Sequence, residues 1–160
     1  MSSLYTATCS TCAFTEDIVE CRTYAYQLSG TLPVFMFTQF AWCQICQRVV
    51  RAEKLHGSDM IDRFIAGMDK PAITHDLERY RQVILNRQSL ARCLDCASMD
   101  IVAAMHGEHE QYELPHPSCG GRISLENSGE MTPGAMYYLY TTEGAYVGEE
   151  EGYAYLGSRH

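Results

Sequence analysis

The sequence has no apolar run long enough to span a bilayer and no low-complexity tract. Its first residues, MSSLYTATCSTC, contain neither the basic segment nor the apolar segment of a secretory signal. Of the 160 residues, 46% are hydrophobic, which is enough to build a buried core in one domain or two small ones. We therefore expect a globular, cytoplasmic protein, and not a membrane, secreted or disordered one.

The sequence also lacks the short motifs of several large enzyme classes. It has no Gly-x-Ser-x-Gly, no phosphate-binding loop, no dinucleotide fingerprint and no His-Glu-x-x-His. A group of acidic residues alternates with histidines and could be written as an acid–base cluster, but a solvated loop is the commoner structure for such a segment. The group consists of Glu108, Glu110 and Glu113 among His106, His109 and His116. We therefore predict no catalytic residues.

Positive charge is scarce, with 12 Lys and Arg against 20 Asp and Glu and a net charge of −8. It is also uneven, since residues 1–47 carry −2, residues 48–92 carry +3 and residues 93–160 carry −9. The acidic last part would repel a phosphate backbone. Only the basic middle favours nucleic acid, because Arg81 and Arg92 could share one face of a helix that continued that far. Arg87 is interpreted as a side chain that extends from an apolar face to solvent.

Cysteine, in contrast, is abundant. Seven of the eight cysteines fall into four short spacings, and the eighth, Cys21, stands apart and is interpreted as a small buried apolar residue. The spacings are three Cys-x-x-Cys pairs and one His-x-x-Cys pair, namely Cys9/Cys12, Cys43/Cys46, Cys93/Cys96 and His116/Cys119. Because a reducing compartment disfavours structural disulfides, metal binding is the favoured explanation.

Each pair is half of a tetrahedral zinc site, so four pairs predict two zinc ions per chain. Of the three ways to combine the pairs, we expect the sequential one. It joins Cys9/Cys12 with Cys43/Cys46, and Cys93/Cys96 with His116/Cys119. The intervening gaps of 30 and 19 residues hold sequence that can return as a hairpin, whereas the helical segment between the two sites looks self-contained.

Several alternatives stay open at this point. A Cys-x-x-Cys pair can carry thioredoxin-like redox chemistry, although no βαβ unit accompanies these pairs. Disulfides would need an oxidising compartment, and iron could replace zinc in a site of four thiolates. His109 or His106 could replace His116 as the nitrogen ligand, but only His116 shares a turn with Cys119.

The stretches CSTC…WCQIC and RCLDC…HPSCGG resemble zinc ribbons, in which two knuckles at the ends of a β-hairpin hold one zinc ion. The resemblance covers residues 9–55 and 93–125. It implies one structural zinc site of four cysteines and one of three cysteines and a histidine. Two positions depart from the family pattern: Ala13 stands where the first knuckle usually has glycine, and His116 replaces a cysteine.

The remaining pattern predicts an α+β protein. The β-forming run LPVFMFTQFAW belongs to an N-terminal module over residues 1–55. Residues 56–91 form a helical pair, with a first helix that begins at Ser58 and is stopped by Pro71, and a second that begins after Thr74. Residues 92–160 form the second zinc-ribbon-like module, a β-hairpin that turns near Glu143-Gly144, and an acidic tail.

With two zinc ions bound by thiolates, the net charge becomes about −11, which favours protein partners over nucleic acid. Tyrosines of the C-terminal part would supply amphipathic contact area. They are Tyr137, Tyr138, Tyr140, Tyr146, Tyr153 and Tyr155. We predict a protein-binding adaptor, regulator or inhibitor and no enzyme. The alternatives are a nucleic-acid-associated zinc-ribbon protein that uses the basic helical segment and, third, a zinc or thiol-redox enzyme.

Overall fold

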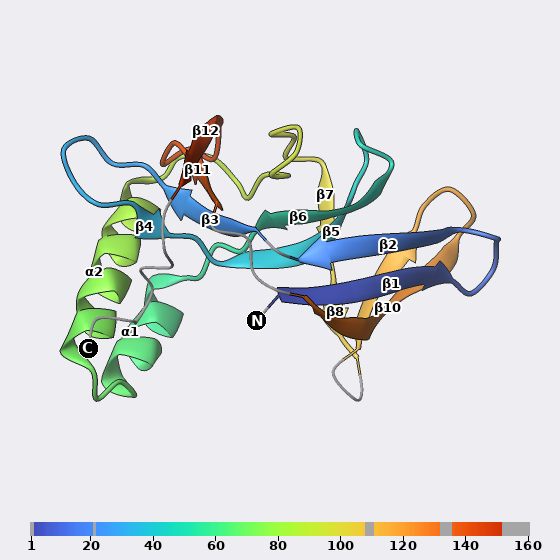
Figure 1. Cartoon of the computed structure of the whole chain (residues 1–160), viewed down its shortest axis with the longest axis horizontal. Coiled ribbons are helices and arrows are strands. Elements are labelled where there is room, and N and C mark those ends of the chain that lie inside the picture. Colours follow the sequence, from blue (N-terminus) through green and yellow to red (C-terminus); the bar gives the residue numbers. More distant parts are fainter. Residues whose placement is uncertain (1, 21, 108–110, 132–135, 152–160) are drawn as a thin grey trace. The chain divides into compact units, whose positions relative to one another are not determined.

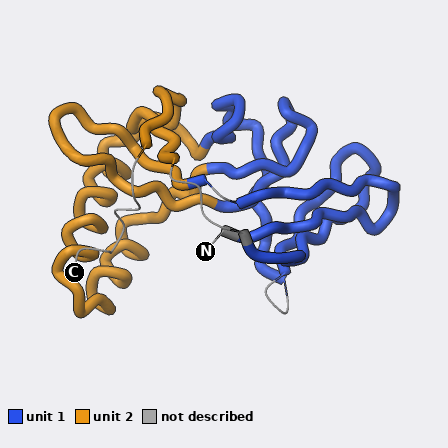
Figure 2. The backbone as a smooth tube through the Cα atoms, in the orientation of Figure 1, with its two compact units in different colours: residues 1–22, 39–52, 92–134 blue, residues 23–38, 53–91, 135–160 orange. Residues whose placement is uncertain are grey.

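The structure is a computed structural model that describes residues 2–20, 22–107, 111–131 and 136–151. It divides into two compact units, each assembled from segments far apart in the sequence (Figure 2). Unit 1 takes Met1–Arg22, Gln39–Ala52 and Arg92–Gly134, and unit 2 takes Thr23–Thr38, Glu53–Ala91 and Ala135–His160. The boundaries expected from the sequence, 1–55, 56–91 and 92–160, do not coincide with these units.

Unit 1 contains a five-stranded sheet in the order β2-β1-β10-β9-β8, in which every neighbouring pair is antiparallel (Figure 1). Its strands are β1 (Ser2–Cys9), β2 (Thr15–Glu20), β8 (Met105–His106), β9 (Tyr112–His116) and β10 (Gly121–Met131). Two hairpins, β1/β2 and β9/β10, therefore lie side by side through the pairing of β1 with β10.

A second, three-stranded sheet of unit 1 has the order β6-β5-β7. It consists of β5 (Thr38–Cys43), β6 (Arg48–Glu53) and β7 (Ile101–Ala103). Apolar side chains from both sheets form one core, which holds the sequence's single tryptophan, Trp42. The core residues are Ala7, Phe40, Trp42, Val49, Leu114, Ile123 and Leu125.

Unit 2 contains the two helices and a mixed four-stranded sheet in the order β12-β11-β3-β4. The strands are β3 (Thr23–Tyr26), β4 (Val34–Phe35), β11 (Met136–Tyr140) and β12 (Tyr146–Glu151), and β11 runs parallel to β3. Helix α1 spans Ser58–Ala66 and helix α2 spans Pro71–Asn86. Ile61 of α1 and Leu77, Tyr80 and Val83 of α2 are buried.

A buried ion pair lies in unit 2. The Arg87 guanidinium donates to both carboxylate oxygens of Glu53, at 2.6 and 2.5 Å, and the two side chains are 2% and 0% exposed. Tyr26 Oη donates to the same carboxylate at 3.0 Å, and Arg87 also donates to the carbonyl of Thr142 at 2.9 Å. Burial, and next the charge of Glu53, raise the pKa of Tyr26. The sequence had suggested that Arg87 extends to solvent, and this interpretation was wrong.

The prediction of an α+β protein is confirmed, since strands dominate and the two helices are adjacent in the chain. The hairpin near Glu143-Gly144 is also confirmed, with Gly144 at a φ of +79°. The predicted start of the second helix, after Thr74, was wrong, because α2 begins at Pro71. Helix α1 ends at Ala66, before that proline. Among the described residues, no helix is long and apolar enough to cross a membrane.

Candidate metal centres

The structure brings all eight candidate ligands together in two groups of four, but the pairing is nested and not sequential. The first and last pairs form what we name the outer cluster, Cys9, Cys12, His116 and Cys119. The second and third pairs form the inner cluster, Cys43, Cys46, Cys93 and Cys96. The sequential pairing expected from the sequence is therefore wrong, while the two ligand sets, Cys₃His and Cys₄, are those expected. Both clusters lie in unit 1.

Strand pairing explains the nesting. Each pair of the outer cluster occupies the tip of a hairpin, between β1 and β2 and between β9 and β10. Because β1 pairs antiparallel with β10, with Cys9 opposite Ile123, the two tips lie at the same end of the sheet. In the inner cluster, Cys43 and Cys46 lie in the turn between β5 and β6. The segment of Cys93 is joined to this hairpin by its bridge to Ala52 and by the pairing of Ile101 with Cys43.

The separations between ligand atoms match a zinc tetrahedron. Zinc–sulfur bonds of about 2.3 Å and zinc–nitrogen bonds of about 2.0–2.1 Å imply tetrahedron edges of about 3.8 Å between sulfurs and about 3.6 Å between sulfur and nitrogen. In the outer cluster, Cys9 Sγ lies 3.5 Å from Cys119 Sγ. His116 Nδ1 lies 3.3 Å from Cys9 Sγ, 3.5 Å from Cys12 Sγ and 3.2 Å from Cys119 Sγ.

The inner cluster has the same dimensions, with 3.6 Å between Cys43 Sγ and Cys96 Sγ and 3.9 Å between Cys46 Sγ and Cys93 Sγ. It is more deeply placed, since Cys43 and Cys93 are fully buried, whereas Cys12 and Cys119 of the outer cluster are exposed. In both clusters all four ligand atoms lie within 4.8 Å of one another. The donor sets therefore fit tetrahedral zinc.

Backbone geometry shapes three of the four turns in the same way. In each of these turns, the N–H of the residue four positions after the first ligand donates a hydrogen bond to the carbonyl of that ligand. These bonds, all of 2.9 Å, run from Gln47 to Cys43, from Ala97 to Cys93 and from Gly120 to His116. The residue that donates has a positive φ of 53°, 60° and 73°, respectively. This left-handed residue closes the turn and leaves both ligand side chains on one side of it.

The turn at Cys9 is built differently. The N–H of Cys9 donates to the carbonyl of Phe14 at 3.1 Å, and Thr8 pairs with Thr15. Ala13 is not among the described residues with positive φ. The alanine that departs from the zinc-ribbon pattern is therefore compatible with this turn, because no left-handed residue is needed there.

Both glycines of the CGG sequence have a structural reason. Gly120 adopts the left-handed φ of +73°, which glycine tolerates best. At Gly121 a Cβ atom would lie 2.5 Å from Thr11 Oγ1 and 3.0 Å from Cys9 Sγ. The second glycine therefore lets the β9/β10 hairpin tip approach the turn that carries Cys9. Thr11 and Gly121 are the site residues that sequence reasoning missed, since no local pattern links positions so far apart.

Aromatic residues surround the histidine ligand. His116 is only 5% exposed, and its ring lies edge-to-face against Trp42 at 4.9 Å and next to Phe14 at 5.0 Å. These contacts leave Nδ1 directed at the three sulfurs of the outer cluster. The imidazole thus joins the core to the cluster, which a cysteine at this position would not do because its side chain is smaller.

Each cluster contains thiols whose pKa values are shifted in opposite directions. Hydrogen bonds from the backbone N–H groups of Thr11 and then Cys12 lower the pKa of Cys9 to about 6, against the effect of burial. Against a hydrogen bond from the Gly121 N–H, burial and the neighbouring Cys9 thiol raise the pKa of Cys119 in the outer cluster.

Against burial, a hydrogen bond from the Ser98 N–H lowers the pKa of Cys96 in the inner cluster. In the same cluster, burial raises the pKa of Cys46 to about 12 and also raises the pKa of Cys93. A cation must therefore displace protons to bind the inner cluster, and its charge would compensate the buried thiolates.

The other candidate residues do not join a cluster in the described part of the chain. His106 is exposed and its ring lies tilted against Tyr112, with centroids 4.8 Å apart, and Glu113 pairs with Arg122 at 3.4 Å. His109, Glu108, Glu110 and Cys21 lie outside the described residues.

Adding a methyl group at the contact between the two outer turns tests this geometry. Gly121→Ala should destabilise unit 1 by about 1–3 kcal/mol, because the new Cβ overlaps Thr11 and Cys9. Gly129→Ala is the matched control, since Gly129 is also in β10 and a Cβ there would meet nothing within 4 Å. Urea unfolding followed by Trp42 fluorescence measures both. Equal midpoints for the two variants would contradict the close approach.

Comparison of the chain with protein-family profiles, with curated proteins and with solved structures finds no match.

Proposed function

We propose that this protein binds two structural zinc ions and that its work is to bind another protein. The observation that carries the metal proposal is the pair of four-ligand clusters with tetrahedral separations. Soft thiolate donors with at most one imidazole favour zinc over magnesium, calcium or manganese. The metal role is structural and not catalytic, since four protein ligands occupy every corner of a tetrahedron and leave none for water.

Native mass spectrometry combined with elemental analysis tests the metal proposal. We expect two zinc ions per chain, held by the eight cluster residues. Purification in the presence of excess ferrous iron checks the alternative metal, because iron bound by thiolates absorbs visible light and zinc does not. A colourless, folded, metal-free chain would overturn the proposal. A stoichiometric iron content at the inner cluster would replace zinc there.

Exposed apolar residues beside the inner cluster support a protein partner. Ile45, between the two ligands of its turn, is 67% exposed, and Met99, just after the turn of Cys93 and Cys96, is 48% exposed. The N–H of Gln44 donates to the carbonyl of Asp100 at 3.0 Å, which places the two turns next to each other. Exposed apolar side chains on a metal-stiffened turn are suited to contact another protein.

The tyrosines of the C-terminal part contribute less surface than the sequence suggests. Tyr140 is 3% exposed and belongs to the core of unit 2, and Tyr137 and Tyr138 are half-buried. Tyr146 is exposed and packs edge-to-face on Tyr140 at 5.6 Å. Tyr153 and Tyr155 lie outside the described residues. We therefore base the proposed protein contact on the turns of unit 1.

Nucleic acid is the less favoured partner because the arginines of the basic segment are engaged within the protein. Arg81 pairs with Asp62 at 3.3 Å, and Arg87 pairs with Glu53. Arg92 lies beyond the end of α2 and donates to the carbonyl of Ala97 at 2.8 Å, so it shares no helix face with Arg81. We expect no salt-dependent binding to nucleic acid at low ionic strength.

A pull-down from the native cell with matched variants tests the protein-binding proposal. Ile45→Asp should lose the captured partner while it keeps two zinc ions, because it changes only an exposed side chain. Met105→Asp is the control, since Met105 is 57% exposed and lies in β8 of the other sheet of unit 1. Capture of the same proteins by both variants would contradict a contact at the turns.

A further inference from the structure

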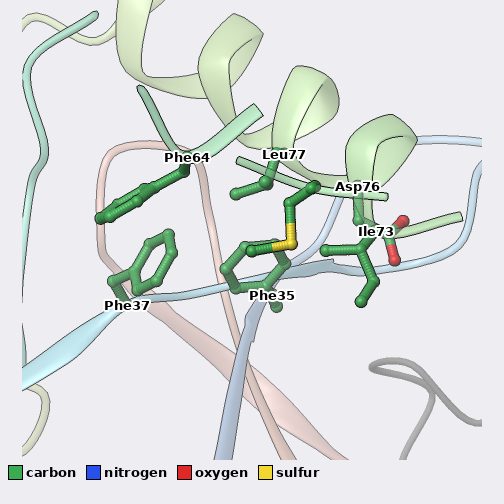
Figure 3. A pocket seen from close by; sticks show the side chains of 7 residues that line it. Phe35, Phe37, Phe64, Ile73, Asp76 and Leu77 are labelled. Atoms are coloured by element: carbon green, nitrogen blue, oxygen red, sulfur yellow. The ribbon is translucent and has the colours of Figure 1, made fainter. Parts of the chain in front are cut away.

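A pocket in unit 2 lies between the two helices and the segment of β4. Its volume is about 370 Å³, and six of its seven lining side chains are apolar. They are Phe35, Phe37, Phe64, Met68, Ile73 and Leu77, and the seventh residue is Asp76 (Figure 3). Phe37 and Phe64 lie at one end of the pocket, and Ile73 and Asp76 lie at the other.

The aromatic wall is held in place by residues behind it. Phe35 stacks on Tyr80 with ring centroids 5.6 Å apart, and Phe37 meets Tyr80 edge-to-face at 5.0 Å. Tyr80 is fully buried, its hydroxyl donates to the carbonyl of Lys54 at 3.0 Å, and it accepts from the N–H of His56 at 3.3 Å. The wall is thus formed before any ligand arrives, as is usual for small-molecule sites.

Among the described residues, Asp76 is the one charged side chain that lines the pocket. Arg79 Nη1 lies 3.9 Å from Asp76 Oδ1, which is the limit of an ion pair. The other terminal nitrogen of Arg79 donates to the carbonyl of Leu32 and to Thr31 Oγ1. Arg79 therefore compensates the Asp76 carboxylate only in part, and an ammonium group at this end of the pocket would find an acceptor of opposite charge.

Size and lining together define the ligand. An apolar cavity of about 150 Å³ holds one benzene ring, so this pocket admits about two rings. Aromatic edges and faces on its walls complement a planar apolar group. We propose that this pocket binds a small planar hydrophobic molecule that carries a primary ammonium group, with the rings between Phe35, Phe37 and Phe64 and the ammonium at Asp76.

Three probes of one skeleton test the proposal, namely 2-(1-naphthyl)ethylamine, 2-(1-naphthyl)ethanol and 1-naphthylacetate. We expect the amine to bind about three- to fivefold more tightly than the alcohol, as for a partly exposed ion pair, and the acid to bind most weakly. Calorimetry measures the dissociation constants. Chemical shifts of the Ile73, Leu77 and Met68 methyl groups locate the bound probe in the full chain.

Matched variants separate the charge effect from the apolar pocket. Asp76→Asn should abolish the preference for the amine and keep the affinity for the alcohol, which also shows that the pocket is still folded. Glu78→Gln removes the same charge from an exposed position of α2 outside the pocket, and should keep the preference. Equal affinity of all three probes for the unmodified chain would indicate a purely apolar occupant, such as a partner's side chain, and would overturn the proposal. Absence of shifts at the methyl groups of these three residues would also overturn it.

Discussion

Replacing Cys46 with serine should abolish zinc binding at the inner cluster and unfold unit 1. A structural zinc ion contributes about 10–16 kcal/mol of apparent binding free energy, whereas a folded domain is stable by only about 5–15 kcal/mol. The free energy lost with the inner metal therefore exceeds the free energy of unfolding of a typical domain. Loss of the metal would also leave the buried Cys43 and Cys93 without a partner cation in an apolar cluster of the core.

Fluorescence gives a direct measurement of this effect. Trp42 is the single tryptophan, it is 1% exposed, and it lies in unit 1, so its emission should move to longer wavelength when unit 1 unfolds. Ile45→Ser is the matched control, because it introduces the same residue at the neighbouring exposed position and keeps all four ligands. A Cys46→Ser chain with one zinc ion and the emission of the unmodified protein would show that the inner metal is not structural.

Replacing Glu53 with glutamine should destabilise unit 2 by about 3–5 kcal/mol. The change leaves the Arg87 guanidinium buried without an opposite charge, and the desolvation of a lone buried ion is costly. Asp62→Asn is the matched control, because it breaks the exposed pair with Arg81 and should cost about 1 kcal/mol or less.

Both helices belong to unit 2, so urea unfolding followed by far-ultraviolet circular dichroism reports on this unit. The double variant Glu53→Met with Arg87→Met should recover much of the lost stability, since apolar residues of similar size avoid burying either charge. If Glu53→Gln unfolds at the same urea concentration as Asp62→Asn, the buried pair of Glu53 and Arg87 does not determine the stability of unit 2.

The cluster residues could be identified from sequence because each half-site is local. Two ligands separated by two residues define a turn, and the same spacing reveals His116 as the partner of Cys119. The combination of half-sites could not be predicted, because it depends on the pairing of β1 with β10 across more than a hundred residues. Loop-closure entropy changes by only about 0.6 kcal/mol for each doubling of loop length, so the gaps between cysteine pairs carry little information.

Arg87 shows the same limit in unit 2. Its position at the end of a basic helical segment suggested a solvent-exposed side chain, because its partner Glu53 is 34 residues away and was assigned to a different module. One local feature of this unit was misread for another reason. Pro71 was interpreted only as the residue that stops the first helix. Proline is also favoured in the first turn of a helix, and Pro71 is the first residue of α2.

The nested order of the two clusters determines which one first has all its ligands during synthesis of the chain. Cys9 is separated by 110 residues from Cys119, whereas Cys43 is separated by 53 residues from Cys96. At about 5–20 residues per second, the ribosome adds the missing half of the outer cluster about 5–20 s after Cys9, and that of the inner cluster about 3–10 s after Cys43. The inner cluster is therefore the first to have all its ligands, and the N-terminal cysteine pair waits for the last segment of unit 1 to be made.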